Sequence, residues 1–213
     1  MLLLLSCSFL PSCFCPSACS NARNLVPSYS PALAEELRDG SSHQGTVTSM
    51  EPNESTFVLH SDSNKKRKAK IVRLVDVPGH SRLQPKLDEF LPHAAGIVFV
   101  VDSLEFLPNC GLASEYLYDI LTKASMVKKK IPILICCNKM HLIYLLLPFC
   151  NDKLRASRSA ILAADISNDF TLGVPGEAFS FSQCRNKVTV AESSGLTGEV
   201  AQVEQFIREC LNP

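Results

Sequence analysis

The chain has 213 residues, of which 21 are basic and 21 acidic, so its formal net charge is zero. This balance gives no global field that would favour nucleic acid or an anionic membrane surface, and we expect no direct nucleic-acid partner. The length allows one domain with a substantial core, and the 46% hydrophobic content is typical of a globular protein.

The first 31 residues differ in composition from the rest. Residues 1–31 are rich in Ser, Cys and Pro without sustained periodicity, so we predict a disordered or non-native leader. Its apolar start, 1–10, is shorter than the roughly 20 residues that cross a bilayer, and no basic residue precedes it as in a signal peptide; a cleaved signal peptide is the alternative. No other stretch approaches transmembrane length, so we expect no membrane helix.

The ten cysteines do not form the evenly spaced framework of a small secreted domain. We therefore expect a reduced protein that faces the cytosol. Four cysteines lie in the predicted leader, and a zinc site on Cys13, Cys15 and Cys19 would need a fourth ligand. A metal-binding Cys protein is the alternative that this cluster leaves open.

Residues 33–37 predict a short helix that ends before Gly40, a residue type that commonly stops helices. Two strands, 56–59 and 71–75, follow. The polar turn between them, 61–70, contains five basic residues, and we interpret it as a solvated hairpin tip rather than a nuclear signal or an anion contact.

Two unbroken apolar runs, 96–102 and 131–137, predict strands that are buried on both faces, as in a parallel sheet. Residues 112–126 between them have the apolar stripe of an amphipathic helix. A further strand at 188–191 and a C-terminal helix from about residue 199 complete the pattern. Strands that alternate with helices predict an α/β fold with a mostly parallel sheet.

Polar residues follow the predicted strands, at the edge where open α/β sheets bind ligands. Asp76 comes directly after the strand 71–75, and Gly79 follows it. A carboxylate at a strand end can hold Mg²⁺, and a glycine lets a backbone amide approach a phosphate closely. The pair therefore suggests a phosphate and magnesium site, although many ordinary turns share this pattern.

Two further motifs follow the next strands of the same sheet. Asn138 and Lys139 come directly after the strand 131–137, as at the start of the guanine motif of GTPases. Ser194 and Gly195 follow the last strand, where a backbone amide could meet a guanine carbonyl oxygen. Three such motifs in this order, at the ends of successive strands, predict a P-loop GTPase-like fold with helices on both faces of the sheet.

Several stretches resemble the β subunit of the signal recognition particle receptor, of plant type, an Arf-like small GTPase family. These stretches are 37–40, 46–53, 76–80, 97–103, 154–160, 179–183 and 187–193. Those around 154–182 lie in an insertion that Ras-like and other Arf-like proteins lack, which separates this family from another branch of trafficking GTPases. The resemblance covers roughly 37–139 and 152–212.

The resemblance implies a protein at the cytosolic face of the endoplasmic reticulum, which binds GTP and Mg²⁺ and holds the receptor α subunit for co-translational targeting at the translocon. It also implies roles for individual residues. Carried onto this chain, these are Thr48 (or Thr46) and Asp76 at Mg²⁺, Gly79 at the γ-phosphate, His80 at the attacking water, Asn138 and Lys139 under the guanine, and Ser194 and Gly195 closing the base pocket.

The chain also departs from the family pattern. None of its nine glycines is followed by Lys, so the phosphate-binding sequence Gly-x-x-x-x-Gly-Lys is absent, and we expect the first strand to be missing too. His141 stands where the guanine motif has Asp, and 141–151 is an atypical apolar insertion. We therefore expect an incomplete GTPase-like domain at 32–212.

These departures leave the question of enzymatic activity open. We expect GTP binding to be weak or absent, no hydrolysis, and no catalysis by His80. The alternatives to a receptor subunit are a nucleotide-free pseudo-GTPase that acts as a binding partner and a non-functional splice product.

Overall fold

The computed structural model describes residues 1–6, 29–40, 51–59, 70–78, 84–102, 113–114, 116–138, 172, 180–193 and 199–211. Within these ranges a six-stranded sheet has the order β2-β3-β1-β4-β5-β6. The strands are β1 (Leu2–Ser6), β2 (Asn53–Val58), β3 (Ile71–Pro78), β4 (Gly96–Asp102), β5 (Ile133–Asn138) and β6 (Val188–Ser193). Neighbouring strands are parallel except β2 and β3, which pair antiparallel. The mostly parallel sheet and the hairpin of its first two predicted strands are confirmed.

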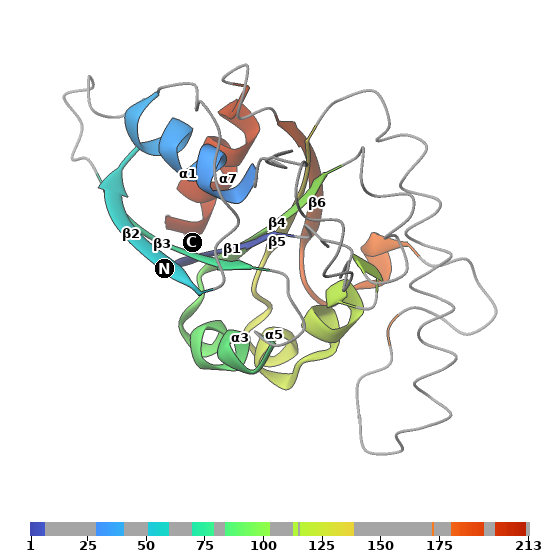
Figure 1. Cartoon of the computed structure of the whole chain (residues 1–213). Coiled ribbons are helices and arrows are strands. Elements are labelled where there is room, and N and C mark those ends of the chain that lie inside the picture. Colours follow the sequence, from blue (N-terminus) through green and yellow to red (C-terminus); the bar gives the residue numbers. More distant parts are fainter. Residues whose placement is uncertain are drawn as a thin grey trace, which may run out of the picture.

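The expectation that the first strand is missing is wrong, because Leu2–Ser6 form β1 at the centre of the sheet, between β3 and β4 (Figure 1). Leu2 and Leu3 are fully buried and lie in two different core clusters, one for each face of the sheet. A run of leucines suits a strand that is covered on both sides. The predicted leader is also wrong at its other end, because 29–31 begin the helix α1 (Tyr29–Asp39). Residues 7–28 of the predicted leader lie outside the described residues.

Helices cover both faces of the sheet, as predicted. On one face lie α1 (Tyr29–Asp39) and α7 (Ala201–Leu211); on the other lie α3 (Gln84–Phe90), the helical residues 116–122 and α5 (Ala124–Lys129) (Figure 1). Two short 3-10 helices, η2 (Leu91–His93) and η4 (Phe181–Gln183), precede β4 and β6. Within the described ranges, no helix combines the length and the apolar character needed to span a bilayer.

The core consists of two apolar layers that the central strands separate. In β4, Ile97, Phe99 and Val101 face the layer beneath α3 and the helical residues 116–122. Val98 and Val100 face the layer beneath α1 and α7. This alternation explains why 97–101 has no polar position within it.

The contact between α7 and the start of β4 is very close. A Cβ atom on Gly96 would lie 2.5 Å from the Sγ atom of Cys210 and 3.2 Å from Cε1 of Phe206. The missing side chain at Gly96 therefore lets the end of α7 pack directly on the strand.

A buried amide fixes the connection between α5 and β5. The side chain of Asn186, 3% exposed, donates hydrogen bonds to the carbonyl oxygens of Met126 (3.0 Å) and Ile131 (2.9 Å). Between these two residues Lys130 ends α5 in the left-handed conformation, with φ at 51°. The amide thus ties the segment before β6 to the turn before β5.

Candidate functional site

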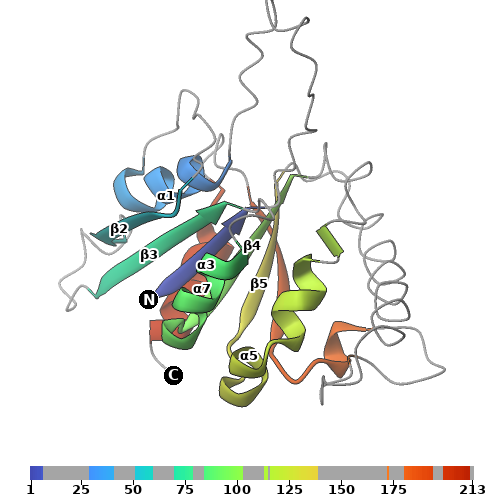
Figure 2. The ribbon, with the colours of Figure 1, turned by 60° about the horizontal axis from the view of Figure 1, so that its bottom comes forward.

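The carboxyl ends of the parallel strands lie along one edge of the sheet, the upper edge in Figure 2. At the centre of this edge, Ser6 of β1 lies opposite Pro78 of β3 and Val100 of β4. We refer to this side as the carboxyl edge. In α/β sheets of this kind, ligands bind beyond this edge, so a residue with a role in ligand binding should lie close to it.

Asp76 lies two residues before the end of β3, and its Cα pairs with Leu4 of β1 and Asn53 of β2. The residue is 7% exposed. A carboxylate that is buried near the carboxyl edge needs a cation or hydrogen-bond donors as partners. Both the Mg²⁺ role and the simpler role of accepting backbone amides meet this need.

The two guanine motifs begin at neighbouring strand ends. Asn138 is the last residue of β5, and its Cα pairs with Asp102 of β4 on one side and Ser193 of β6 on the other. Ser194 and Gly195 directly follow Ser193 in the sequence. The backbone therefore brings the starts of these two motifs side by side at the carboxyl edge.

The other predicted site residues lie outside the described residues. They are Thr46, Thr48, Gly79, His80, Lys139, His141, Ser194 and Gly195, together with the insertion 141–151. Two of these residues are nevertheless close in sequence to a described strand end. Gly79 follows Pro78 at the end of β3, and the segment with Thr48 leads into Asn53, which pairs with Asp76.

Sequence reasoning missed the part of the site formed by β1. The connection from Ser6 to Tyr29 takes the place, between first strand and first helix, where GTPases carry the phosphate-binding loop. Residues 7–28 contain neither glycine nor lysine. The strand and the helix are thus present, while the sequence between them lacks the residues that cradle a phosphate. The apolar run Leu2–Leu5 was the signal that could have revealed the strand.

The fit to Mg²⁺ and GTP therefore differs between the central connection after β1 and the strand ends on either side of it. The ends of β5 and β6 and the buried Asp76 suit the base and metal sides of such a site. The connection after β1 does not suit the phosphates, because it offers no glycine amides and no lysine.

The thiol of Cys137, one residue before Asn138, does not add a nucleophile to the edge. Burial, with smaller contributions from the neighbouring Cys136 and Glu192, raises the pKa of the Cys137 thiol to about 12. At neutral pH it is therefore protonated, and a protonated thiol is a poor nucleophile and metal ligand. Cys137 belongs to the core of the sheet.

Comparison with known families and proteins gives one consistent result. Residues 29–145 match the family model of the signal recognition particle receptor beta subunit. The receptor subunit beta of Dictyostelium discoideum is 30% identical over 194 residues, which cover 83% of this chain and 64% of that protein. The subunit of Mus musculus is 35% identical over 137 residues, covering 59% and 51%. The chain thus spans about half to two thirds of the length of these relatives.

Solved structures show the same fold. The mammalian signal recognition particle receptor superposes with a TM-score of 0.75 at 24% identity, covering 98% of both chains. The receptor protein SRb of Chaetomium thermophilum, solved with GDP and Mg, gives a TM-score of 0.61 at 17% identity, covering 98% of this chain and 96% of that one. The predicted GTPase-like architecture is confirmed.

Proposed function

Because the chain belongs to the family of signal recognition particle receptor β subunits, we propose that it acts as a β-subunit-like GTP-binding protein in protein targeting to the endoplasmic reticulum. Its partner in this role is the receptor α subunit, and its place is the cytosolic face of the membrane. The observation that carries the proposal is the family match, which includes α1 and the strands β2 to β5.

The carboxyl edge supports the nucleotide part of the proposal. Asn138 and the segment after Ser193 start from paired strand ends, as a shared base pocket requires. Asp76 and Thr48 would hold Mg²⁺, Gly79 would meet the γ-phosphate, and Lys139 would lie under the base. Bound Mg²⁺ would neutralise phosphate charge. Since residues 7–28 carry no phosphate-binding sequence, we expect weaker GTP binding than in relatives that have it.

A second candidate function is that of a nucleotide-free interaction module for the same α subunit. The specific observation in its favour is the connection between β1 and α1, which lacks both glycine and lysine. The sheet itself is held by its two apolar layers, so the fold has a stabilising core that does not depend on a nucleotide.

Titration with a fluorescent GTP analogue in the presence of Mg²⁺, with ATP as competitor, tests nucleotide binding. Saturable binding that GTP displaces and ATP does not supports the first candidate. The matched variants are Asn138→Ala, which removes a predicted guanine contact, and Gln202→Ala, which removes an exposed amide from α7. We expect the first to weaken binding and the second to leave it unchanged; equal effects of the two would contradict the proposed base pocket.

Co-precipitation with the receptor α subunit, with and without added GTP, separates the two candidates. Capture that requires GTP supports the GTP-binding subunit. Capture that is equal in both conditions, from a chain that binds no GTP analogue, supports the nucleotide-free module. No capture in either condition would overturn both proposals.

A further inference from the structure

The edge opposite the carboxyl edge carries a row of basic side chains. It is formed by the first residues of the parallel strands and lies along the lower side of Figure 2, where the two chain ends, α5 and the η4 segment are found. We call it the amino edge. Its basic residues are Lys70, Lys123, Lys128, Lys129, Lys130, Arg185 and Lys187, and the carboxylates near it are Asp88, Glu89 and Glu209.

Backbone and side-chain bonds fix this row to the start of the strands. Lys187 directly precedes β6, and its carbonyl accepts a hydrogen bond from Ile133 of β5 at 2.9 Å. Lys70 directly precedes β3, and its Nζ donates to the carbonyl of Leu211 at the end of α7, at 2.7 Å. Lys70 and Lys187 are thus joined to the sheet and to α7 by these bonds.

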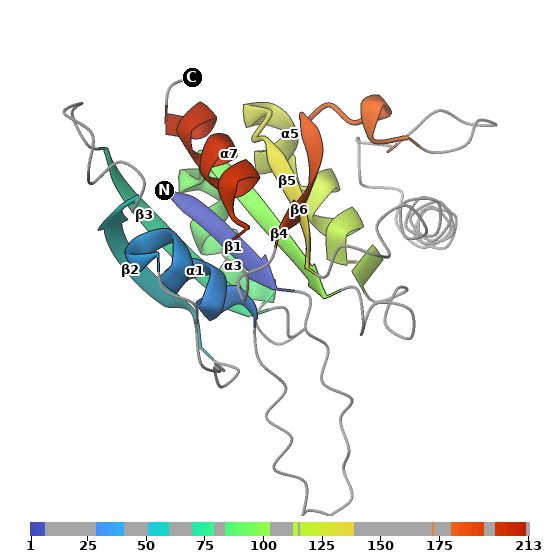
Figure 3. The ribbon, with the colours of Figure 1, turned by 90° about the horizontal axis from the view of Figure 1, so that it is seen from above.

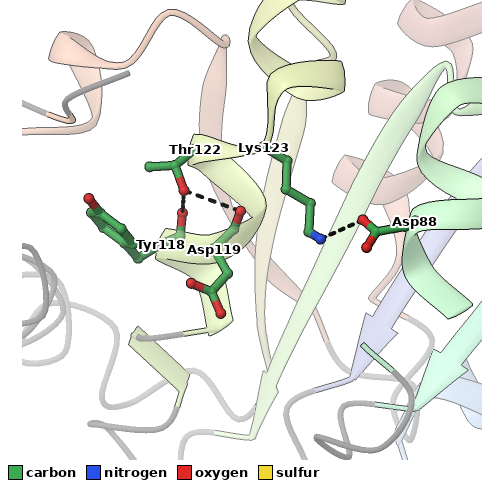
Figure 4. A network of polar contacts seen from close by, with 5 residues as sticks. All are labelled: Asp88, Tyr118, Asp119, Thr122 and Lys123. Atoms are coloured by element: carbon green, nitrogen blue, oxygen red, sulfur yellow. Dashed lines mark hydrogen bonds and ion pairs between the residues drawn. The ribbon is translucent and has the colours of Figure 1, made fainter. Parts of the chain in front are cut away.

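Some of these charges are balanced within the molecule. Lys123 pairs with Asp88 of α3 (Figure 4), and Lys187 pairs with Glu209 of α7 at 3.1 Å. Lys129 donates to the carbonyl of Pro92, which leaves its positive charge uncompensated. Lys128 and Lys130 are exposed, and neither makes a hydrogen bond or an ion pair in the part of the chain that the structure describes. The described residues of the amino edge therefore carry a net positive charge, although the chain as a whole is neutral.

An apolar residue lies in the same row. Ile71, the first residue of β3, is 68% exposed and is the exposed large hydrophobic residue of the described ranges. Neighbouring strands are about 4.8 Å apart, so the three strand spacings from β3 to β5 put Ile71 and the lysines before β5 roughly 14 Å apart. A small ligand would not reach both, whereas a flat surface would.

We propose that the amino edge is a docking surface for an anionic phospholipid bilayer. Lysine ammonium groups act as strongly hydrated point charges and suit a layer of headgroups, while recognition of nucleic acid relies more on the planar fork of arginine, of which this row has one. Ile71 provides an apolar side chain for the interface between headgroups and acyl chains. The proposal rests on exposed charge and does not depend on nucleotide binding.

Vesicle sedimentation tests the proposal with the full chain, using vesicles of phosphatidylcholine alone and vesicles that also contain phosphatidylserine. We expect binding only to the second kind, and weaker binding as salt is added. Lys128→Gln with Lys130→Asn should lower the partition coefficient about fivefold for each lysine removed. Asn suits position 130 because it tolerates the left-handed backbone there. The matched control, Lys128→Arg with Lys130→Arg, keeps both charges and should bind as the parent does.

Either of two results would overturn the proposal: no binding of the parent chain to the anionic vesicles, or equal binding of the neutral and arginine variants when circular dichroism shows both to be folded. Loss of binding to duplex RNA in the neutral variant, without vesicle binding by the parent, would instead assign the row to nucleic acid.

A tryptophan reporter identifies the edge that meets the bilayer, because the chain contains no natural Trp. Ile71→Trp places one at the amino edge, and Gln202→Trp places one at the exposed start of α7, the far end of the helix whose last residue contacts Lys70. With anionic vesicles, we expect the emission of the first to shift to shorter wavelength and that of the second to stay unchanged. Equal shifts at both positions would overturn the assignment of the amino edge.

Discussion

Asn186 shows how much a single polar side chain can organise in this fold. Its amide lies in the core, bonds to two carbonyl oxygens on either side of the left-handed Lys130, and so joins the segment before β6 to the turn before β5. Buried carbonyl groups without donors are costly, and this is the reason to expect a large effect from a small change here.

We predict that Asn186→Ala lowers the free energy of unfolding by about 1–3 kcal/mol, because the carbonyl of Ile131 loses a buried donor. Urea unfolding followed by circular dichroism measures the change. The control is Gln205→Ala, which removes an exposed amide bonded to Glu209 and should change stability by less than about 0.5 kcal/mol. Equal losses in the two variants would show that the buried hydrogen bonds of Asn186 do not contribute to stability.

Cys137 makes stability depend on pH in the alkaline range. Burial raises the pKa of its thiol in the folded chain to about 12, whereas an exposed thiol ionises near a pKa of about 8.5. The protonated thiol is thus favoured by folding, so its contribution is complete below about pH 8.5 and is lost as the pH rises toward 12.

We therefore predict that the free energy of unfolding falls between about pH 9 and 11, and that Cys137→Val makes this fall less steep, since valine does not ionise. Urea titrations at several pH values measure both slopes. A second readout is the reaction of Cys137 with iodoacetamide at pH 8, assigned by peptide mass spectrometry, which should be slow until the chain is unfolded. Rapid labelling of the folded chain would contradict the burial of this thiol.

At the scale of elements, the five residues of β1 join the two sides of the sheet. It pairs with β3 on one side and β4 on the other, so without it the sheet would divide into two parts. Its Leu2 and Leu3 each contribute to a different apolar layer.

We predict that Leu3→Ala costs about 2–5 kcal/mol of stability, because it opens a cavity beneath a fully buried position in the centre of the sheet. Chemical unfolding of the full chain measures this value. Ile71→Ala is the control, since that side chain is 68% exposed and should matter by no more than about 0.5 kcal/mol. A small effect at Leu3 would mean that β1 contributes little to the sheet.

Of two equally apolar strands at the centre of the sheet, β4 could be predicted from the sequence and β1 could not. The run 96–102 is apolar without alternation, which directly indicated a strand buried on both faces, and the structure confirms it as β4. The equally apolar Leu2–Leu5 stands at the start of a Ser-, Cys- and Pro-rich stretch, and that composition suggested a leader. Its partners, β3 and β4, lie more than sixty positions away, and single-sequence periodicity carries no information about such distant pairing.

The candidate site was predictable to a similar degree. Asp76 and Asn138 were selected because polar residues after buried strands gather at one edge, and both lie at that edge. The pairing of Asn138 with Ser193 could not be predicted, because it depends on the register between two strands that are distant in the sequence. The roles assigned to Thr48, Gly79, His80, Lys139, Ser194 and Gly195 stay predictions.

On the scale of the whole molecule, the sheet separates two surfaces of different kind. The carboxyl edge carries the predicted nucleotide motifs, and the amino edge carries the exposed lysines. In Figure 3 the amino edge lies at the top, beside the two chain ends and α5, and the strands run downward from it to the carboxyl edge. The strands between the two edges are five to eight residues long, and β1, β3, β4 and β5 contribute to both apolar layers. Within the described ranges these packed strands are the connection between the edges, and a packed strand has a single arrangement.

We predict that the two edges act independently. The partition coefficient for anionic vesicles should change by less than about twofold when GTP and Mg²⁺ are added, since coupling requires contacts that differ between two states of the protein. Sedimentation with and without nucleotide measures it, and binding of the receptor α subunit to vesicle-bound and free chain provides the reciprocal measurement. A change of tenfold or more in either would show that the edges communicate.

The central position of β1 also has a consequence for biosynthesis. Ribosomes add about 5–20 residues per second, and Ile71 follows Ser6 by 65 positions, so β1 leaves the peptidyl transferase centre roughly 3–13 s before the first residue of β3. During that interval neither hydrogen-bonding side of this leucine-rich strand has its native neighbour, a condition that favours pairing with other chains. The sheet is completed only when β6 has been made, and its first residue, Val188, follows Ser6 by 182 positions.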